Sequence, residues 1–91
     1  MRQAMLDAEV EDDVYGGDLT VLKLQDIAAK LLGREAALFV PSETMEDLIC
    51  ALNHCSQFGS EMILGDECYM NIYQQDGCAT LARIHSRTVT T

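Results

Sequence analysis

Basic residues are scarce in this chain. Among its 91 residues, six lysines and arginines stand against fifteen aspartates and glutamates, and the formal net charge is −9. Proteins that bind nucleic acid use clustered Lys and Arg to neutralise phosphates. The chain has no such cluster, and its excess of carboxylates repels a phosphate backbone. We therefore do not expect nucleic acid among its partners.

Long apolar runs are also absent. No run approaches the roughly eighteen residues of a transmembrane helix, and the acidic start MRQAMLDAEVEDD lacks the apolar core of a signal peptide. We expect no membrane partner and a cytoplasmic location. The apolar share of 48% is nevertheless too high for a disordered chain. Length and composition together predict one domain at most.

The cysteines lack a metal-binding pattern. Their spacing, at positions 50, 55, 68 and 78, matches no zinc template, so we expect free thiols in a reducing compartment. His54 beside Cys55 leaves a Cys/His metal site as an alternative to a solvated histidine on a helix. The six acids from Asp7 to Asp18 do not alternate as calcium ligands do, and we interpret them as solvated charge.

The first third of the chain predicts helices joined by a loop. Residues 1–9 can form a short helix, and the acidic segment with a Gly-Gly pair that follows is typical of a loop. Apolar residues at helical spacing predict a second helix from about 18–20 to 32, and Gly33 is the expected stop. Lys23 and Lys30 share the solvated face of this helix. Nothing in their surroundings suggests covalent catalysis.

A strand, a helix and a second strand are expected next. The nearly continuous apolar run 36–40 predicts a strand buried on both faces. A helix over about 44–57 and a strand over 61–64 would complete one βαβ unit with a right-handed crossover. Ligands of such sheets bind beyond the carboxyl ends of the strands. We therefore expect residues 42–44 and 65–69 on the same rim.

Two strands alone do not make a stable open sheet. A buried parallel pair with one crossover helix leaves much apolar surface uncovered. The chain is thus expected to be a piece of a larger α/β domain with a mainly parallel sheet, or to hide these faces in an oligomer. Residues 79–84 fit a strand and the end of a helix equally well, and this choice stays open.

Several motifs carry a resemblance to a known family. They are MRQAMLDAEVEDDVYGGDLTV, LLGREAALFVPS and MILGDE, with the spaced Tyr73, Gly77, His85 and Arg87. In these motifs the chain resembles the low-specificity L-threonine aldolases over essentially its whole length. The resemblance implies a pyridoxal 5'-phosphate (PLP) lyase of the aspartate-aminotransferase fold. Such enzymes cleave L-threonine or L-allo-threonine, small amino-acid substrates, to glycine and acetaldehyde, usually as homotetramers with active sites at subunit contacts.

The same resemblance implies that the 91 residues are an incomplete, N-terminal part of the large, cofactor-binding domain. The Schiff-base lysine of the family lies downstream of these residues, so we expect no catalytic residue here and no activity from this chain alone. Ser42 and Thr44 are the expected contacts on the phosphate side of PLP, and Tyr69 is the expected contact of its ring. Tyr15 and Asp18 would belong to the rim or to a subunit contact.

The chain departs from the family pattern at these cofactor positions. Glu43 stands in Ser-Glu-Thr where the family has Ser-Gly-Thr, Glu46-Asp47 replaces Gly-Asn, and Tyr69 replaces a histidine. A glycine lets the backbone approach an anion that N–H groups and the helix dipole then hold. Glu43 adds a negative charge instead. One unit of repulsion at about 4 Å costs roughly 4 kcal/mol at an effective dielectric near 20.

Two interpretations of this helix start stay open. It can be a phosphate cradle, or its own carboxylates can fill the anion site. In the second case Thr44-x-x-Asp47 forms a capping box in its wider form. Glu46 and Asp47 in the first turn would then favour the dipole by about 0.3–1 kcal/mol each. Tyr69 can stack on a pyridine ring, but it cannot replace histidine as a proton carrier near neutral pH.

Three hypotheses about function result. The chain is a fragment of a PLP-dependent threonine aldolase, inactive alone. Alternatively, it is a non-catalytic remnant that pairs with an intact aldolase subunit through the helix at 19–32 and an exposed sheet edge. The third hypothesis is an incomplete product that does not fold stably.

Overall fold

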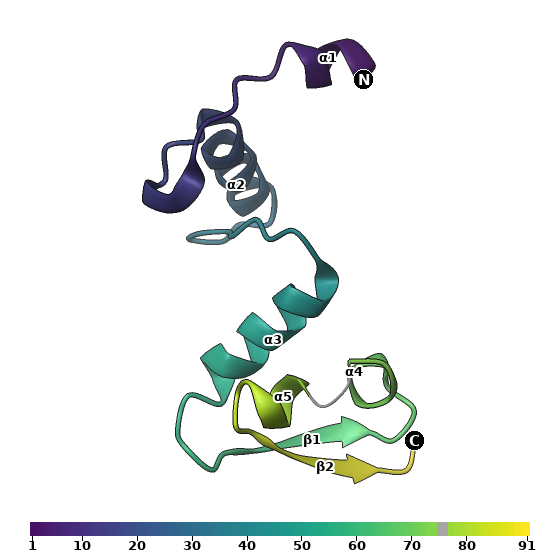
Figure 1. The fold of residues 1–91 in the computed structure, drawn as a ribbon. Coiled ribbons are helices and arrows are strands. Elements are labelled where there is room, and N and C mark those ends of the chain that lie inside the picture. Colours follow the sequence, from purple (N-terminus) through teal and green to yellow (C-terminus); the bar gives the residue numbers. More distant parts are fainter. Residues whose placement is uncertain (75–76) are drawn as a thin grey trace. The chain divides into compact units, whose positions relative to one another are not determined.

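The computed structural model describes residues 1–74 and 77–91, and the chain divides into two compact units, Met1–Phe39 and Val40–Thr91. We call them the N-terminal and the C-terminal unit. The N-terminal unit contains α1 (Arg2–Leu6), the 3-10 turn η1 (Asp13–Tyr15) and α2 (Leu19–Leu31). The C-terminal unit contains α3 (Glu43–His54), β1 (Glu61–Gly65), α4 (Tyr69–Ile72), α5 (Gly77–Thr80) and β2 (His85–Val89) (Figure 1).

Local hydrogen bonds fix both ends of α2. Asp18 is the N-cap residue, and its carboxylate accepts from the N–H of Val21 at 2.9 Å. At the other end Gly33 takes a left-handed φ of 61°, and the N–H of Arg34 donates to the carbonyl of Ala29 at 2.8 Å. This is the Schellman ending that a glycine permits. The prediction of this helix and its stop is confirmed, whereas α1 is shorter than the helix expected over 1–9.

The segment 36–40 is not a strand, and this prediction is wrong. A strand needs a partner with which to form a hydrogen-bond ladder, and no segment of the described chain pairs with these residues. Instead the N–H of Phe39 donates to the side-chain carbonyl of Gln25 at 2.8 Å. Leu38 and Phe39 both keep more than half of their surface exposed. An apolar run predicts that a segment seeks burial, but it does not supply the neighbouring strand.

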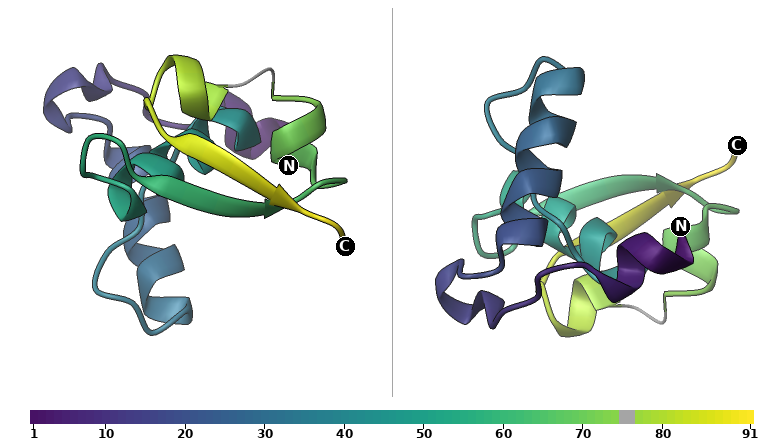
Figure 2. Two further views of the ribbon diagram at one scale, coloured as in Figure 1. Left: turned by 90° about the horizontal axis from the view of Figure 1, so that it is seen from below. Right: turned by 90° about the horizontal axis from the view of Figure 1, so that it is seen from above.

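The strand expected over 61–64 is confirmed as β1, but its parallel partner is β2. The register places Glu61 opposite His85 and Gly65 opposite Val89. Both arrows run side by side in the same direction in the two views of Figure 2. The connection between them consists of α4 and α5, so the βαβ unit expected over 36–64 is also wrong.

Residues 79–84 complete a helix and a turn rather than a strand. Helix α5 ends at Thr80, and β2 begins at His85. The described fold is therefore α/β, with helices and one small parallel two-stranded sheet.

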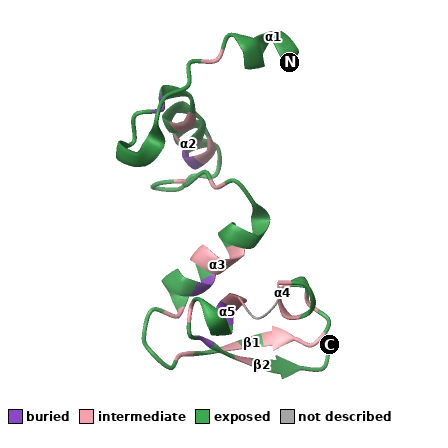
Figure 3. Ribbon diagram, in the orientation of Figure 1, coloured by how far each residue is buried: buried purple, intermediate pink, exposed green. Residues whose placement is uncertain are grey.

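The core of the C-terminal unit is small and lies on one face of this sheet. Helices α3 and α5 pack on that side (Figure 1), and Ala51, Cys78 and Ile84 are buried between them and the sheet, with Ile84 only 1% exposed. Figure 3 shows how little of the chain is buried. This agrees with the expectation that two strands leave apolar surface uncovered. No helix within residues 1–74 and 77–91 is long and apolar enough to cross a membrane.

Candidate functional site

The start of α3 is the first candidate site. Ser42 is its N-cap residue, and the Ser42 hydroxyl accepts from the N–H of Met45 at 3.3 Å. The helix therefore begins at Glu43, which places Thr44 inside the first turn. A residue inside the turn cannot be the N-cap, so the predicted capping box of Thr44 and Asp47 is wrong. The helix expected over 44–57 is confirmed with different bounds.

The first turn of α3 contains both carboxylates and main-chain N–H groups without an acceptor among the described residues. Glu43 and Glu46 lie in the first turn, where the helix dipole favours negative charge. The N–H groups of Glu43 and Thr44 donate to no acceptor in the described part of the chain, as is usual for the first residues of a helix. The turn thus has the donors of an anion site, while its own carboxylates supply the negative charge that such donors attract.

Tyr69, the expected ring contact, lies on a different element. It is the first residue of α4, just beyond the carboxyl end of β1, and more than half of it is exposed. Its ring packs against that of Tyr73, with centroids 5.0 Å apart and planes inclined at 35°. The structure brings Ser42 and Thr44 together in one helical turn. No interaction in the described chain joins either of them to Tyr69.

One contact links the two elements that carry these residues. The carboxylate of Asp47, on α3, accepts a hydrogen bond from the side chain of Gln74, which follows α4. Residues 42–44 and 65–69 nevertheless do not follow two neighbouring strands as predicted, because 36–40 is not a strand. Asp47, expected to cap its own helix, instead joins α3 to the end of α4.

The carboxyl end of β1 is occupied by the chain itself. The Asp66 carboxylate accepts from the main-chain N–H and from the hydroxyl of Thr91, both at 3.2 Å. The hydrogen bond from the Thr91 backbone is the main reason that the pKa of Asp66 lies below its ordinary value. The N–H of Asp66 donates to the carbonyl of Val89 at 2.9 Å. These polar groups of the expected ligand rim therefore already have partners.

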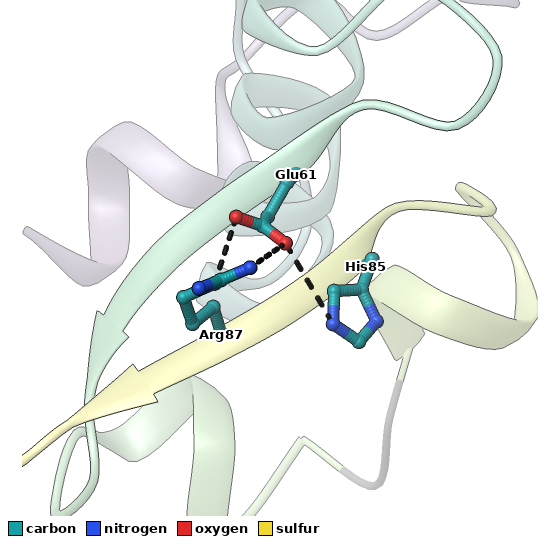
Figure 4. Close-up of polar contacts among 3 residues, drawn as sticks. All are labelled: Glu61, His85 and Arg87. Atoms are coloured by element: carbon teal, nitrogen blue, oxygen red, sulfur yellow. Dashed lines mark hydrogen bonds and ion pairs between the residues drawn. The ribbon is translucent and has the colours of Figure 1, made fainter.

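The uncovered face of the sheet holds a charged cluster (Figure 4). Arg87 binds Glu61 through two nitrogens, at 2.8 and 3.0 Å, and the His85 Nε2 lies 3.8 Å from the same carboxylate. The side chains of His85 and Arg87 are largely open to solvent, and that of Glu61 is 39% exposed, so this cluster stabilises the sheet by about 0–1 kcal/mol. Sequence reasoning missed it, since the three residues become neighbours only once the register of β1 and β2 is known.

The buried Cys78 does not have the environment of a nucleophile. All four cysteines are free thiols, and burial is the main cause that raises the pKa of Cys78, followed by the nearby Asp47 and Cys55. A raised pKa keeps a thiol protonated and unreactive. The described residues contain no group of three or more His, Cys, Asp or Glu side chains that could hold a metal ion.

Tyr15 and Asp18, expected at a rim or subunit contact, differ in exposure. Tyr15 lies in η1 and is almost fully exposed. Asp18 is buried, and its second oxygen accepts from the N–H of Glu11 at 3.1 Å. The hydrogen bonds from Val21 and then Glu11 lower the pKa of Asp18. This carboxylate thus ties the acidic loop to the start of α2.

Comparison with known proteins defines the class of this chain. The family model for the beta-eliminating lyases matches residues 1–91, so the chain belongs to that family. It is 51% identical over 89 residues to low-specificity L-threonine aldolase 1 of Arabidopsis thaliana. It is 43% identical over 89 residues to the low specificity L-threonine aldolase of Escherichia coli strain K12. The resemblance seen in the sequence motifs is confirmed.

The matches cover nearly all of this chain but only a small share of each relative. Each spans 98% of this chain but only 25% of the Arabidopsis protein and 26% of the E. coli protein. The chain therefore spans about a quarter of the length of the curated relatives it matches.

Proposed function

We propose that this chain is the N-terminal part of the cofactor-binding domain of a threonine-aldolase-type enzyme with the aspartate-aminotransferase fold. The complete enzyme would cleave L-threonine or L-allo-threonine to glycine and acetaldehyde, with PLP as its cofactor. The observation that carries the proposal is the family match over all of residues 1–91. The identity of 51% to a relative named as a threonine aldolase supports the choice of reaction.

We also propose that the 91 residues by themselves do not catalyse this reaction. A Schiff-base lysine is a desolvated or otherwise activated amine. The Lys30 amine is exposed and lies 2.6 Å from Asp26, and Lys23 is also exposed. Neither lysine has the environment of an activated nucleophile. The covalent partner of the cofactor must then come from residues outside this chain.

The start of α3 is a weaker site for the phosphate group of PLP than the family pattern implies. The Ser42 hydroxyl accepts the capping bond from Met45 and still has its own proton to donate to a phosphate. Glu43 and Glu46, however, bring two carboxylates to the turn. The repulsion of roughly 4 kcal/mol per charge at about 4 Å is an upper limit, because an exposed glutamate can turn into water. We keep Ser42, Thr44 and Tyr69 as the proposed cofactor-side residues and propose that Glu43 weakens cofactor binding there.

The surroundings of the complete enzyme belong to the same proposal. Its substrate would be a small amino acid, and it would act in the cytoplasm, where the four free thiols are stable. A homotetramer would cover apolar side chains that this chain leaves exposed, among them Leu22, Ile27 and Leu31 on α2.

The test compares the chain alone with the chain completed by a relative. The purified 91-residue protein is expected to release no more glycine from L-threonine than PLP alone does. A chimera then joins residues 1–91 to the remaining three-quarters of the Arabidopsis relative, with and without Glu43→Gly. We expect the Glu43→Gly chimera to be active and the unaltered chimera to need more PLP.

Two outcomes would contradict the proposal. Glycine release by the 91-residue protein above the PLP-only rate would show that catalysis does not need the missing residues. A chimera with both Glu43→Gly and Tyr69→His that folds and assembles as the Arabidopsis enzyme does, yet is inactive, would show that this chain is not an aldolase segment.

A second candidate function is a non-catalytic partner of an intact aldolase subunit. The exposed apolar side chains of α2 and the carboxylates at the start of α3 favour it. Co-purification of the 91-residue chain with a full-length relative supports this function. A monodisperse monomer in that mixture argues against it.

A further inference from the structure

An open hollow of about 490 Å³ lies beside the start of β2. Its lining comes from one short stretch of chain and the preceding helix, namely Ala79, Arg83, Ile84, His85 and Ser86. This end of β2 is opposite to the carboxyl end, where Asp66 binds Thr91. The hollow is therefore separate from the candidate site at the ends of the strands.

Arg83 holds an unusual conformation at the edge of this hollow. Its φ of 56° is the only positive value among the described non-glycine residues. A left-handed conformation costs an L-residue roughly 1–2 kcal/mol, and strain of this kind is a reason to look for function. The guanidinium carbon lies 5.6 Å from the centre of the Phe58 ring, a cation–π contact that orients the group.

Among the described residues, nothing neutralises the charge of Arg83. The C-terminal unit contains two arginines, Arg83 and Arg87, and Arg87 is committed to Glu61 through two hydrogen-bonding nitrogens. No carboxylate in residues 1–74 and 77–91 pairs with Arg83. Its donors remain available to a ligand. A guanidinium presents them as a planar fork that matches an oxyanion.

Ser86 adds donors to the same hollow. The N–H of His85 donates to the carbonyl of Ser60 at 3.0 Å and so points toward β1. Because polar groups of successive strand residues face opposite edges, the N–H of Ser86 points to the free edge of the sheet. The half-buried Ser86 hydroxyl has no partner in the described chain. The His85 ring instead lies with Glu61 on the uncovered face (Figure 4).

We propose that Arg83 and Ser86 form a binding site for a phosphate group at the free edge of β2. The guanidinium supplies charge and two parallel donors, and Ser86 supplies its hydroxyl and its main-chain N–H. The left-handed turn places Arg83 in the lining of the same hollow as Ser86. This site does not depend on the proposed aldolase function, because Ser42 and Thr44 on α3 take no part in it.

The test is a titration of the 91-residue protein with inorganic phosphate at constant ionic strength, followed by amide chemical shifts. We expect saturable shifts at residues 83–86. Arg83→Gly should raise the Kd for phosphate about tenfold, as loss of a charged hydrogen-bonding group does. Glycine accepts the φ of 56° without strain, so this variant keeps the fold. Arg83→Lys keeps the positive charge but loses the two parallel donors of the guanidinium. Its Kd for phosphate should lie between those of the unaltered chain and Arg83→Gly.

The matched control is Arg34→Gln, which removes the same charge from the exposed loop after α2. It should leave the phosphate Kd unchanged. Equal Kd values for Arg83→Gly and Arg34→Gln would overturn the proposal, since binding would then follow net charge alone. Shifts confined to residues 43–46 would also overturn it and would place phosphate at α3 instead. Failure of the aldolase chimera would leave this result untouched.

Discussion

Glu43 acts on the helix and on a bound anion in opposite directions. A carboxylate in the first turn stabilises a helix by about 0.3–1 kcal/mol, whereas its repulsion of a phosphate reaches roughly 4 kcal/mol at close range. After discounting for solvent exposure, the second effect falls to the same order as the first. The residue at position 43 therefore affects cofactor binding and the stability of α3 in opposite directions and by comparable amounts.

Glu43→Gln is expected to tighten binding of PLP to the start of α3. Removing one exposed charge should lower the Kd about fivefold, at a cost of about 0.5 kcal/mol in helix stability. PLP absorbance measures the first effect, and thermal unfolding measures the second. Glu35→Gln makes the same charge change at an exposed position in the loop after α2. Equal PLP affinity in the two variants would show that Glu43 does not face the ligand.

Asp18 makes the start of α2 sensitive to acid. Its folded-state pKa is lowered by the N–H groups of Val21 and Glu11. A group with a depressed pKa contributes stability above its unfolded pKa, and this stability is lost as pH falls through the folded pKa. We expect the helical circular dichroism of the chain to decline as pH falls below the ordinary value of an aspartate. Asp18→Asn keeps a capping oxygen and should weaken this dependence.

The control for this titration is Asp13→Asn in the neighbouring η1 turn. Asp13 is solvent-exposed and lies five residues before the N-cap Asp18. If Asp13→Asn flattened the acid transition as much as Asp18→Asn does, the cap of α2 would not be its cause.

At the scale of elements, the sequence predicted those whose stabilising hydrogen bonds lie within the element itself. Apolar spacing and Gly33 were sufficient for α2, because its cap, its stop and its hydrogen bonds lie within the element. The run 36–40 failed because a strand depends on a partner elsewhere in the chain. Strand β2 was not recognised because its sequence HSRTV has a charged, exposed face and lies in an otherwise weakly patterned tail.

The candidate sites likewise include some that local sequence predicts and some that depend on the folded structure. Ser42 and Thr44 could be placed on a helix start from sequence, although the cap proved to be Ser42. The pairing of Glu61 with Arg87 required the sheet register. The left-handed turn at Arg83 had no sequence signal, because arginine is not a residue that favours this conformation.

The sheet of the C-terminal unit offers a test of where its stability resides. Ile84 is 1% exposed and Ile63, on the other face, is 66% exposed. Ile84→Ala should lower the free energy of unfolding by about 2–5 kcal/mol, through lost burial and a residual cavity. Ile63→Ala removes the same atoms from a solvated face and should change it by less than about 1 kcal/mol. Chemical denaturation measures both. Similar losses would mean that the uncovered face is buried in solution.

At the scale of the whole molecule, apolar exposure and charge oppose each other. Large apolar side chains remain exposed on most elements, and such surface favours association. The net charge of −9 keeps copies of the chain apart. Salt screens this repulsion over about 10 Å at 0.1 M and leaves apolar attraction intact. The state of association should therefore depend on ionic strength.

We expect the purified chain to form larger species as salt is raised, and the exposed face of α2 to mediate this association. Leu31→Gln removes an exposed apolar side chain from that helix and should shift the transition to higher salt in size-exclusion chromatography with light scattering. Leu6→Gln, at a similarly exposed position on α1, should leave it unchanged. A transition that responds equally to both variants would reflect general stickiness. One that moves to lower salt with Leu31→Gln would rule out α2 as the contact, because apolar attraction cannot strengthen when an apolar side chain is lost.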